Sequence, residues 1–158
     1  MSNILYKETQ YFRTLILILL LVVVILAATN IYLSNAETAA SPAIYITTTL
    51  LFTGIIVLFY KLDIIITEDE AILSFGIGLV KRKIATNRLD LASTKILKTT
   101  LLWGIGYRFT PHGTLFNTRL GKAIHIKTKN KNSEFFVVTD NMEAIKTAIK
   151  KAQSISNT

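Results

Sequence analysis

Two long apolar stretches dominate the pattern of hydrophobic and polar positions along this chain. The first runs from Thr14 to Leu33 and includes twelve consecutive Leu, Ile and Val residues, and the second runs from Ala43 to Tyr60. Each is long enough to cross a bilayer core of roughly 30 Å as a helix, which takes about 17 to 25 residues. Because only nine residues separate them, the pattern predicts a transmembrane hairpin.

Beyond Lys61 the pattern changes to short segments of β type separated by turn residues. Alternation of apolar and polar positions is clearest over 123–127, which favours a sheet with one buried face. The turns are those expected between consecutive antiparallel strands. The resulting sheet domain is expected to have about seven strands, one of the segments being irregular. The predicted strands are 62–67, 71–75, 79–85, a less regular piece around 95–102, 107–110, 114–117, 123–128 and 134–139.

An amphipathic helix is expected to end the folded part of the chain. Asp140 is the predicted N-cap, and Glu143 stands three positions later, as in a capping box. An apolar stripe at steps of three and four follows, which predicts one buried helix face. The fold class is therefore α+β. The chain divides into an N-terminal segment 1–13, a hairpin 14–60 with spans 14–33 and 43–60, a domain 61–153 and a flexible tail 154–158.

The charged residues beside the two spans predict their orientation. Lys7 and Arg13 precede the first span and Lys61 follows the second, whereas the connection between the spans carries only Glu37. The positive-inside rule then places both termini in the cytoplasm. A cleavable signal peptide is the competing interpretation, because small residues at 34–36 follow the apolar core. The length of that core and the presence of a second span favour an integral membrane protein.

Composition and charge limit the partners and the kinds of site that this chain can have. The chain carries a net charge of +8, and from position 61 onward 16 Lys and Arg stand against 8 Asp and Glu. Such a domain suits an anionic membrane surface, although nucleic acid or an acidic partner would be attracted as well. The absence of cysteine excludes disulfides, thiolate metal sites and cysteine nucleophiles.

The densest basic cluster consists of Lys81, Arg82, Lys83 and Arg88. A basic strand pair of this kind can hold anionic phospholipid or a partner protein, while a solvated basic strand is the plain structural alternative. In the hairpin, Asn30 falls at a depth similar to that of Thr47 and Thr48 in the second span. We expect a hydrogen-bonded contact there, the alternative being threonines that hydrogen-bond to their own helix.

A glycine-containing motif, Trp103-Gly104-Ile105-Gly106-Tyr107-Arg108, is followed by the segments 113–117 and 121–126. In this order they resemble the small bacterial pleckstrin-homology-like (PH-like) domains of membrane-anchored proteins. The resemblance implies a β-roll of two nearly orthogonal sheets, with the final helix at one open end and two transmembrane helices ahead of the domain. Trp103, Gly104, Gly106 and Arg108 are interpreted as structural positions, with glycines that permit positive φ or close packing. The alternative for Arg108 is an anion anchored by its planar guanidinium.

The remaining polar residues predict no catalytic, metal or cofactor site. His112 and His125 lie 13 positions apart with no carboxylate at metal-ligand spacing, and three neighbouring carboxylates at 68–70 diverge from one turn. The segment 104–106 lacks the Lys-Ser/Thr of a phosphate-binding loop.

The function that these patterns favour is a non-catalytic binding or scaffolding module held at the cytoplasmic face of a bacterial inner membrane. It would dock a protein partner, with anionic lipid as a secondary contact. An accessory subunit of a transporter or channel is one alternative, and a small membrane enzyme is another. Nucleic-acid binding is disfavoured, because the aromatic residues occupy predicted core positions instead of an exposed stacking surface.

Overall fold

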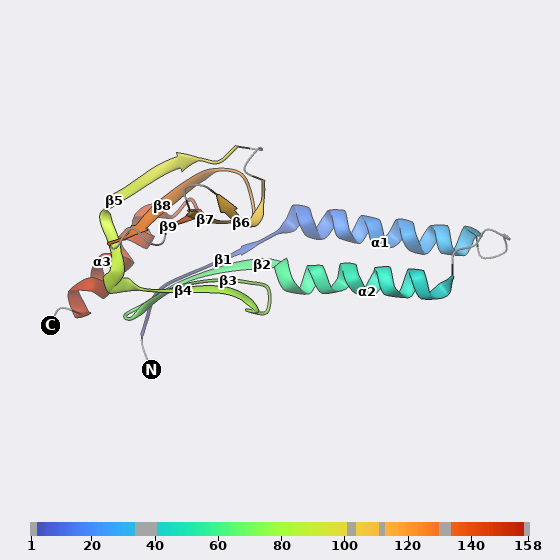
Figure 1. Cartoon of the computed structure of the whole chain (residues 1–158), viewed down its shortest axis with the longest axis horizontal. Coiled ribbons are helices and arrows are strands. Elements are labelled where there is room, and N and C mark those ends of the chain that lie inside the picture. The colour runs from blue at the N-terminus through green and yellow to red at the C-terminus, as the bar shows by residue number, and fades with distance from the viewer. Residues whose placement is uncertain (1–2, 34–40, 101–103, 111–112, 130–133, 157–158) are drawn as a thin grey trace.

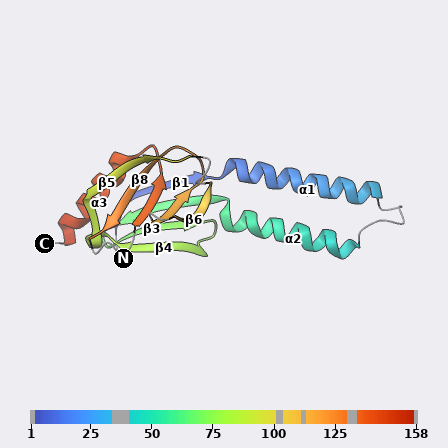
Figure 2. The same cartoon turned by 45° about the horizontal axis from the view of Figure 1, so that its top comes forward.

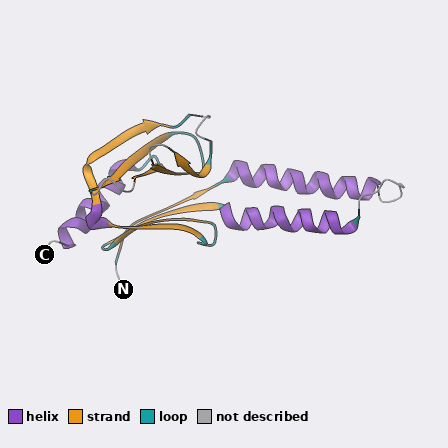
Figure 3. Cartoon of the chain, viewed as in Figure 1, coloured by secondary structure: helices purple, strands orange, loops and turns teal. Residues whose placement is uncertain are grey.

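The computed structural model describes residues 3–33, 41–100, 104–110, 113–129 and 134–156. It is an α+β protein in which a pair of long helices projects from one end of a domain built of two sheets and a C-terminal helix (Figure 1). Strands make up most of that domain, and helix α3 lies at the end opposite the helix pair (Figure 3). The described strands number nine, against the roughly seven expected.

The first sheet has the order β1-β2-β3-β4 and is antiparallel throughout. It is the expected meander for its last three strands, and the inward positions of β2 and β3 are mostly apolar and buried. The bounds are β1 (Ile4–Tyr11), β2 (Lys61–Thr67), β3 (Glu70–Phe75) and β4 (Val80–Ala85).

The second sheet has the order β5-β8-β9-β7-β6. Its bounds are β5 (Leu89–Lys98), β6 (Gly106–Thr110), β7 (Gly113–Asn117), β8 (Lys122–Thr128) and β9 (Glu134–Val138), and a short 3-10 helix, η1 (Thr86–Arg88), precedes β5. Strand β9 lies between β7 and β8 and runs parallel to β7. The expectation of consecutive antiparallel hairpins is therefore wrong for β7 and β8, because β9 separates them.

The helix pair consists of α1 (Arg13–Leu33) and α2 (Pro42–Phe59). Ser41 caps α2, since its hydroxyl oxygen accepts the amide proton of Ala43 at 3.3 Å. Among the described residues, one helix is long and apolar enough to cross a membrane, namely α1 over Arg13–Tyr32, and 6% of its apolar stretch is buried. The apolar part of α2, Ala43–Phe59, is shorter.

The N-terminal segment belongs to the domain instead of standing apart from it. Strand β1 pairs with β2 along its whole length, from Ile4 opposite Thr67 to Tyr11 opposite Lys61. The boundary predicted at position 61 is therefore wrong, because the helix pair is inserted between two neighbouring strands of one sheet. Strand β1 lacks the alternating apolar pattern of the other strands, because its inward positions, Tyr6, Glu8 and Gln10, carry polar groups.

Helix α3 (Met142–Ser156) closes the fold and buries one face against the sheets, as predicted. Its N-terminus differs from the expected capping box. The Asp140 carboxylate pairs with Arg119, and Glu143 pairs with Lys146. The predicted tail is partly helical, because α3 continues through Ser156.

The main core fills the space between the two sheets and α3. Its largest buried side chains come from each of these layers: Phe75 from the first sheet, Phe116 from the second and Ile149 from α3. A smaller cluster, Leu115, Ala123, Phe136 and Val138, lies apart from it in the second sheet.

Candidate functional site

The junction between the helix pair and the first sheet is the best-defined feature outside the core. The Phe12 amide donates to the Tyr60 carbonyl at 2.9 Å, directly after the last β1–β2 pair. Lys61 forms an ion pair with Asp63 at 2.8 Å, and the hydrogen bond that its ammonium group donates to this carboxylate raises the pKa of Lys61. The strand ladder thus continues into the helices without an intervening loop.

Aromatic side chains connect this junction to both sheets. Phe59, the last residue of α2, lies 5.7 Å from Phe75 between ring centroids, and Phe75 stacks on Phe116 of the second sheet at 6.1 Å. Tyr107 meets Phe116 edge to face at 5.2 Å. Pairs in this range add to the energy of burial, so the end of α2 is packed into the core of the domain.

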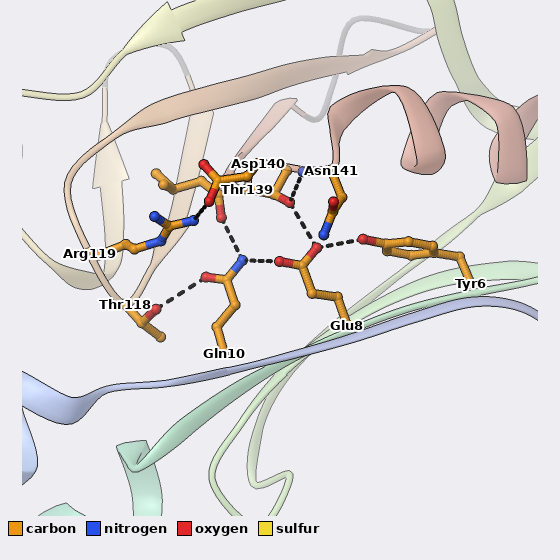
Figure 4. Close-up of polar contacts among 9 residues, drawn as sticks. Tyr6, Glu8, Gln10, Thr118, Arg119, Thr139, Asp140 and Asn141 are labelled. Carbon is orange, nitrogen blue, oxygen red and sulfur yellow. Dashed lines mark hydrogen bonds and ion pairs between the residues drawn. The ribbon is translucent and has the colours of Figure 1, made fainter.

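A polar network joins β1 to the end of β9 and the start of α3 (Figure 4). The Glu8 carboxylate accepts hydrogen bonds from the Tyr6 hydroxyl at 2.5 Å, the Gln10 amide at 2.8 Å and the Thr139 hydroxyl at 2.8 Å. The Gln10 amide also donates to the Val138 carbonyl at 2.8 Å. Strand β1 is therefore tied across the domain as well as to β2.

Tyr6 is the residue of this network whose ionisation is most changed. Burial raises the pKa of its phenol above the ordinary value, and the hydrogen bond to Glu8 raises it further. The phenol therefore remains a proton donor to Glu8 at neutral pH. Tyr6 therefore contributes a structural hydrogen bond to the network.

The predicted basic cluster is divided among three places. Lys81 and Lys83 are exposed on one face of β4, and Lys83 pairs with Glu70 at 2.8 Å. Arg82 points to the other face, where its guanidinium donates to the Thr114 hydroxyl of β7 at 2.6 Å. Arg88 is exposed in η1, beyond the far end of β4. The four residues do not form one anion-binding site, because a strand alternates its side chains between two faces.

The glycine motif is a structural turn over its described part. Gly104 and Gly106 both have positive φ, 65° and 111°, as expected. The Arg108 guanidinium packs on Gly104, where a Cβ would come within 2.4 Å of its central carbon. The Asn117 side chain accepts from the Gly106 amide at 2.8 Å. Trp103 lies outside the described residues.

The predicted contact between Asn30 and Thr47 or Thr48 is not formed within the described chain. The Thr48 hydroxyl donates to the Ile44 carbonyl of its own helix at 2.7 Å, and Thr47 is exposed. Asn30 instead lines a groove of about 450 Å³ between α1 and α2, together with Tyr45 and Thr49. The groove is lined mostly by apolar residues.

The β8–β9 hairpin carries a polar contact between His125 and Glu134 that the sequence did not predict. His125, 4% exposed, lies 2.8 Å from a Glu134 oxygen and stacks on Phe136, while Lys127 pairs with the second Glu134 oxygen at 2.9 Å. The hydrogen bond from Lys127 lowers the pKa of Glu134, and the one from His125 adds to the effect. The sequence pattern that could have predicted this contact is a pair of basic residues at i and i+2, His125 and Lys127, on the strand that precedes Glu134.

Within the described residues, no group of three His, Cys, Asp or Glu residues can hold a metal ion, and His112 lies outside that part of the chain. A hollow of about 500 Å³ beside the start of α3 is lined by Lys122, Asp140 and Glu143 among others. Its basic and acidic side chains are mixed, so it has no strong preference for one ligand charge.

Comparisons with protein-family models, with curated proteins and with solved structures find no match to this chain.

Proposed function

We propose that this chain is a membrane-anchored binding module, in which α1 and α2 cross a bacterial inner membrane as a hairpin and hold a PH-like domain at its cytoplasmic face. The domain docks a protein partner and performs no catalysis. Anionic phospholipid is a secondary contact.

The surface of both helices supports the membrane hairpin. Their outward side chains are large, apolar and exposed, which is unfavourable in water and favourable in lipid. On α1 they include Leu17, Ile18, Leu20, Leu21, Val24 and Ile25, and on α2 they include Ile44, Ile46, Leu50, Leu51 and Val57.

The observation that carries the proposal is that α1 and α2 connect two hydrogen-bonded neighbours, β1 and β2. A single crossing by α1 would leave β1 and β2 on opposite sides of the membrane and would break every pair between them. If α1 crosses, α2 must therefore return. A cleavable leader is disfavoured for the same reason, since cleavage after α1 would remove the edge strand of the first sheet.

Charge supports the cytoplasmic side for the domain. Lys7, Arg13 and Lys61 flank the two helices at the end where the domain lies, and the connection at the other end carries only Glu37. Basic residues next to a span are retained on the cytoplasmic side.

Two edge strands support the binding role. Strands β4 and β6 each end a sheet, so each offers one side of its backbone for strand addition by a partner. Strand β6 carries Phe109, which is 79% exposed. Two packed sheets and a C-terminal helix also agree in outline with the PH-like resemblance.

Topology can be tested with single cysteines, because the chain has none of its own. Asn3→Cys, Glu37→Cys and Gln153→Cys are made separately and labelled in intact cells with a membrane-impermeant maleimide. We expect labelling at position 37 in intact cells, and at positions 3 and 153 only after permeabilisation. Labelling of positions 3 and 153 from opposite sides would refute the hairpin.

The docking surface can be tested by photo-crosslinking in the native cell. A benzophenone amino acid replaces Phe109 on β6 or Lys83 on β4, and the matched control replaces Lys150, which is exposed on α3. We expect a discrete protein adduct from an edge strand and none from position 150. Adducts with lipid alone at both edges would remove the protein partner from the proposal.

A second candidate function, an accessory subunit of a transporter or channel, is favoured by the groove that contains Asn30. A groove of about 450 Å³ along two helices is shaped to receive a neighbouring transmembrane helix. Crosslinking from Leu50→Cys, on the groove wall, to a larger membrane protein would favour this role over the edge-docking module.

A further inference from the structure

The turn between β3 and β4 has an unusual surface for a polar domain. It consists of Gly76, Ile77, Gly78 and Leu79, and the two large side chains are 62% and 72% exposed. The glycines supply the positive φ that the turn needs, 53° and 89°. Turns in water usually carry polar residues at the other positions. Two exposed apolar side chains therefore indicate that this turn is not surrounded by water alone.

The turn is packed against the last turn of α2. The Gly76 amide donates to the Lys61 carbonyl at 2.8 Å. A Cβ on Gly76 would lie 2.3 Å from the carbonyl oxygens of both Val57 and Leu58, so the two backbones are in direct contact. Both views show the tip of the β3–β4 hairpin beside the domain end of α2 (Figures 1 and 2).

The length of α2 fixes the depth of this turn. Its 18 residues span about 27 Å at 1.5 Å per residue, slightly less than a hydrocarbon core of roughly 30 Å. A helix this short uses its whole length to cross, which brings Val57 and Leu58 to the inner edge of the core. The β3–β4 turn beside them is then level with the boundary between headgroups and acyl chains.

Charge behind the tip agrees with that depth. Lys81 is the first exposed residue of β4 after Leu79, and it lies on the open face of the first sheet. A lysine one or two positions behind an apolar tip places its ammonium group at the level of lipid phosphates, where basic residues are favoured.

We propose that the β3–β4 turn inserts Ile77 and Leu79 into the acyl–headgroup boundary of the leaflet at which α2 ends. This inference rests on the proposed two-span hairpin. With the two helices, the turn forms a third point of contact with the bilayer. Three points fix the rotation of the domain about the helix axis as well as its height.

The test uses the full-length chain with one cysteine at a time, coupled to an environment-sensitive fluorophore and reconstituted into vesicles of phosphatidylethanolamine and phosphatidylglycerol. Ile77→Cys and Leu79→Cys report the turn. Ile155→Cys, exposed on α3, is the control in water, and Leu20→Cys, exposed in the middle of α1, is the control in the core. The midpoint of unfolding verifies that each labelled chain folds.

At positions 77 and 79 we expect emission shifted to shorter wavelength than at position 155, quenching by lipids with a shallow nitroxide, and little quenching by aqueous iodide. Position 20 should be quenched by a deep nitroxide. If position 20 is quenched by the deep nitroxide while positions 77 and 79 are quenched by iodide alone, the result supports the proposed hairpin and overturns this inference. If position 20 is reached by iodide and not by lipid, the hairpin fails and the inference fails with it.

Discussion

Glu8 accepts three hydrogen bonds in the polar network where β1 meets the end of β9. Its replacement by Ala leaves the partly buried hydroxyls of Tyr6 and Thr139 and the Gln10 amide without this partner. We expect Glu8→Ala to lower the free energy of unfolding by about 1–3 kcal/mol. Urea unfolding in detergent micelles measures the change. Lys7→Ala, at the adjacent exposed position, is the matched control and should stay within about 0.5 kcal/mol of the unaltered chain. Equal losses from both variants would contradict the role given to Glu8.

Because of Tyr6, we expect the folded chain to lose stability against unfolding in alkali. Its pKa in the folded chain is raised above the ordinary value of 10.0, so above pH 10 the unfolded chain releases a proton that the folded chain retains. The stability due to this shift is complete below pH 10 and is lost as the pH rises beyond it. Between about pH 9 and about pH 11, the melting temperature should fall more for the unaltered chain than for Tyr6→Phe. Parallel curves would contradict the shift.

Gly76 and Gly78 form a matched pair for testing the contact between the turn and α2. Both have positive φ, but a Cβ at Gly76 would strike backbone oxygens of α2, whereas nothing lies within 4 Å of a Cβ at Gly78. Gly78→Ala should cost about 1 kcal/mol from backbone strain alone. Gly76→Ala adds the displacement of α2 and should cost clearly more, as measured by urea unfolding of both variants. Equal costs would show that the turn moves freely away from α2.

Strand β1 and its place beside β2 change the expectation for the isolated domain. A fragment that begins at Lys61 lacks the edge strand and the Glu8 network, so we expect it to aggregate or to unfold without cooperativity. Replacing residues 12–60 by an Asn-Gly turn joins Tyr11 to Lys61, which already face each other across the ladder. This joined chain should be soluble and monomeric by gel filtration and should melt cooperatively. A stable fragment 61–158 would contradict the essential role of β1.

The elements that the sequence predicts well are those with a regular apolar pattern. Strands β2, β3 and β8 and helix α3 lie within a few residues of their expected bounds, because each buries alternate or i, i+3/i+4 positions. Strand β5 begins earlier than expected, since its register shifts between Asp90 and Lys95 and interrupts the alternation. The parallel pairing of β7 with β9 has no local signal, because strand order depends on contacts between distant segments.

The candidate site was predictable only in part. Period-two alternation alone separates Arg82 from Lys81 and Lys83 once β4 is recognised as a strand. The importance of the β3–β4 turn was not predictable, because it follows from the contact of Gly76 with α2. Two glycines between apolar residues indicate a turn, and only the packed structure shows what that turn touches.

For the whole molecule, the distribution of basic residues predicts how the domain meets a charged bilayer. In the joined chain, which lacks the helices, affinity for phosphatidylglycerol vesicles should fall steeply with salt. Lys81→Ala, near the helix end of the domain, should weaken binding by roughly fivefold. Arg88→Ala, at the other end of β4, is the control and should bind as the unaltered joined chain does, in a vesicle co-sedimentation assay. Equal losses from both would indicate attraction by net charge alone.

The insertion of the helix pair between β1 and β2 also sets an order of assembly. Strand β1 is synthesised first, but its partner follows only after the 49 residues between positions 11 and 61. Closing so long a loop in a free chain costs entropy that grows with the logarithm of its length. If α1 and α2 cross the bilayer as the proposed hairpin, they bring the ends of that loop together before β2 is available. On that proposal membrane insertion precedes sheet formation, and the bilayer is the template that aligns the first two strands.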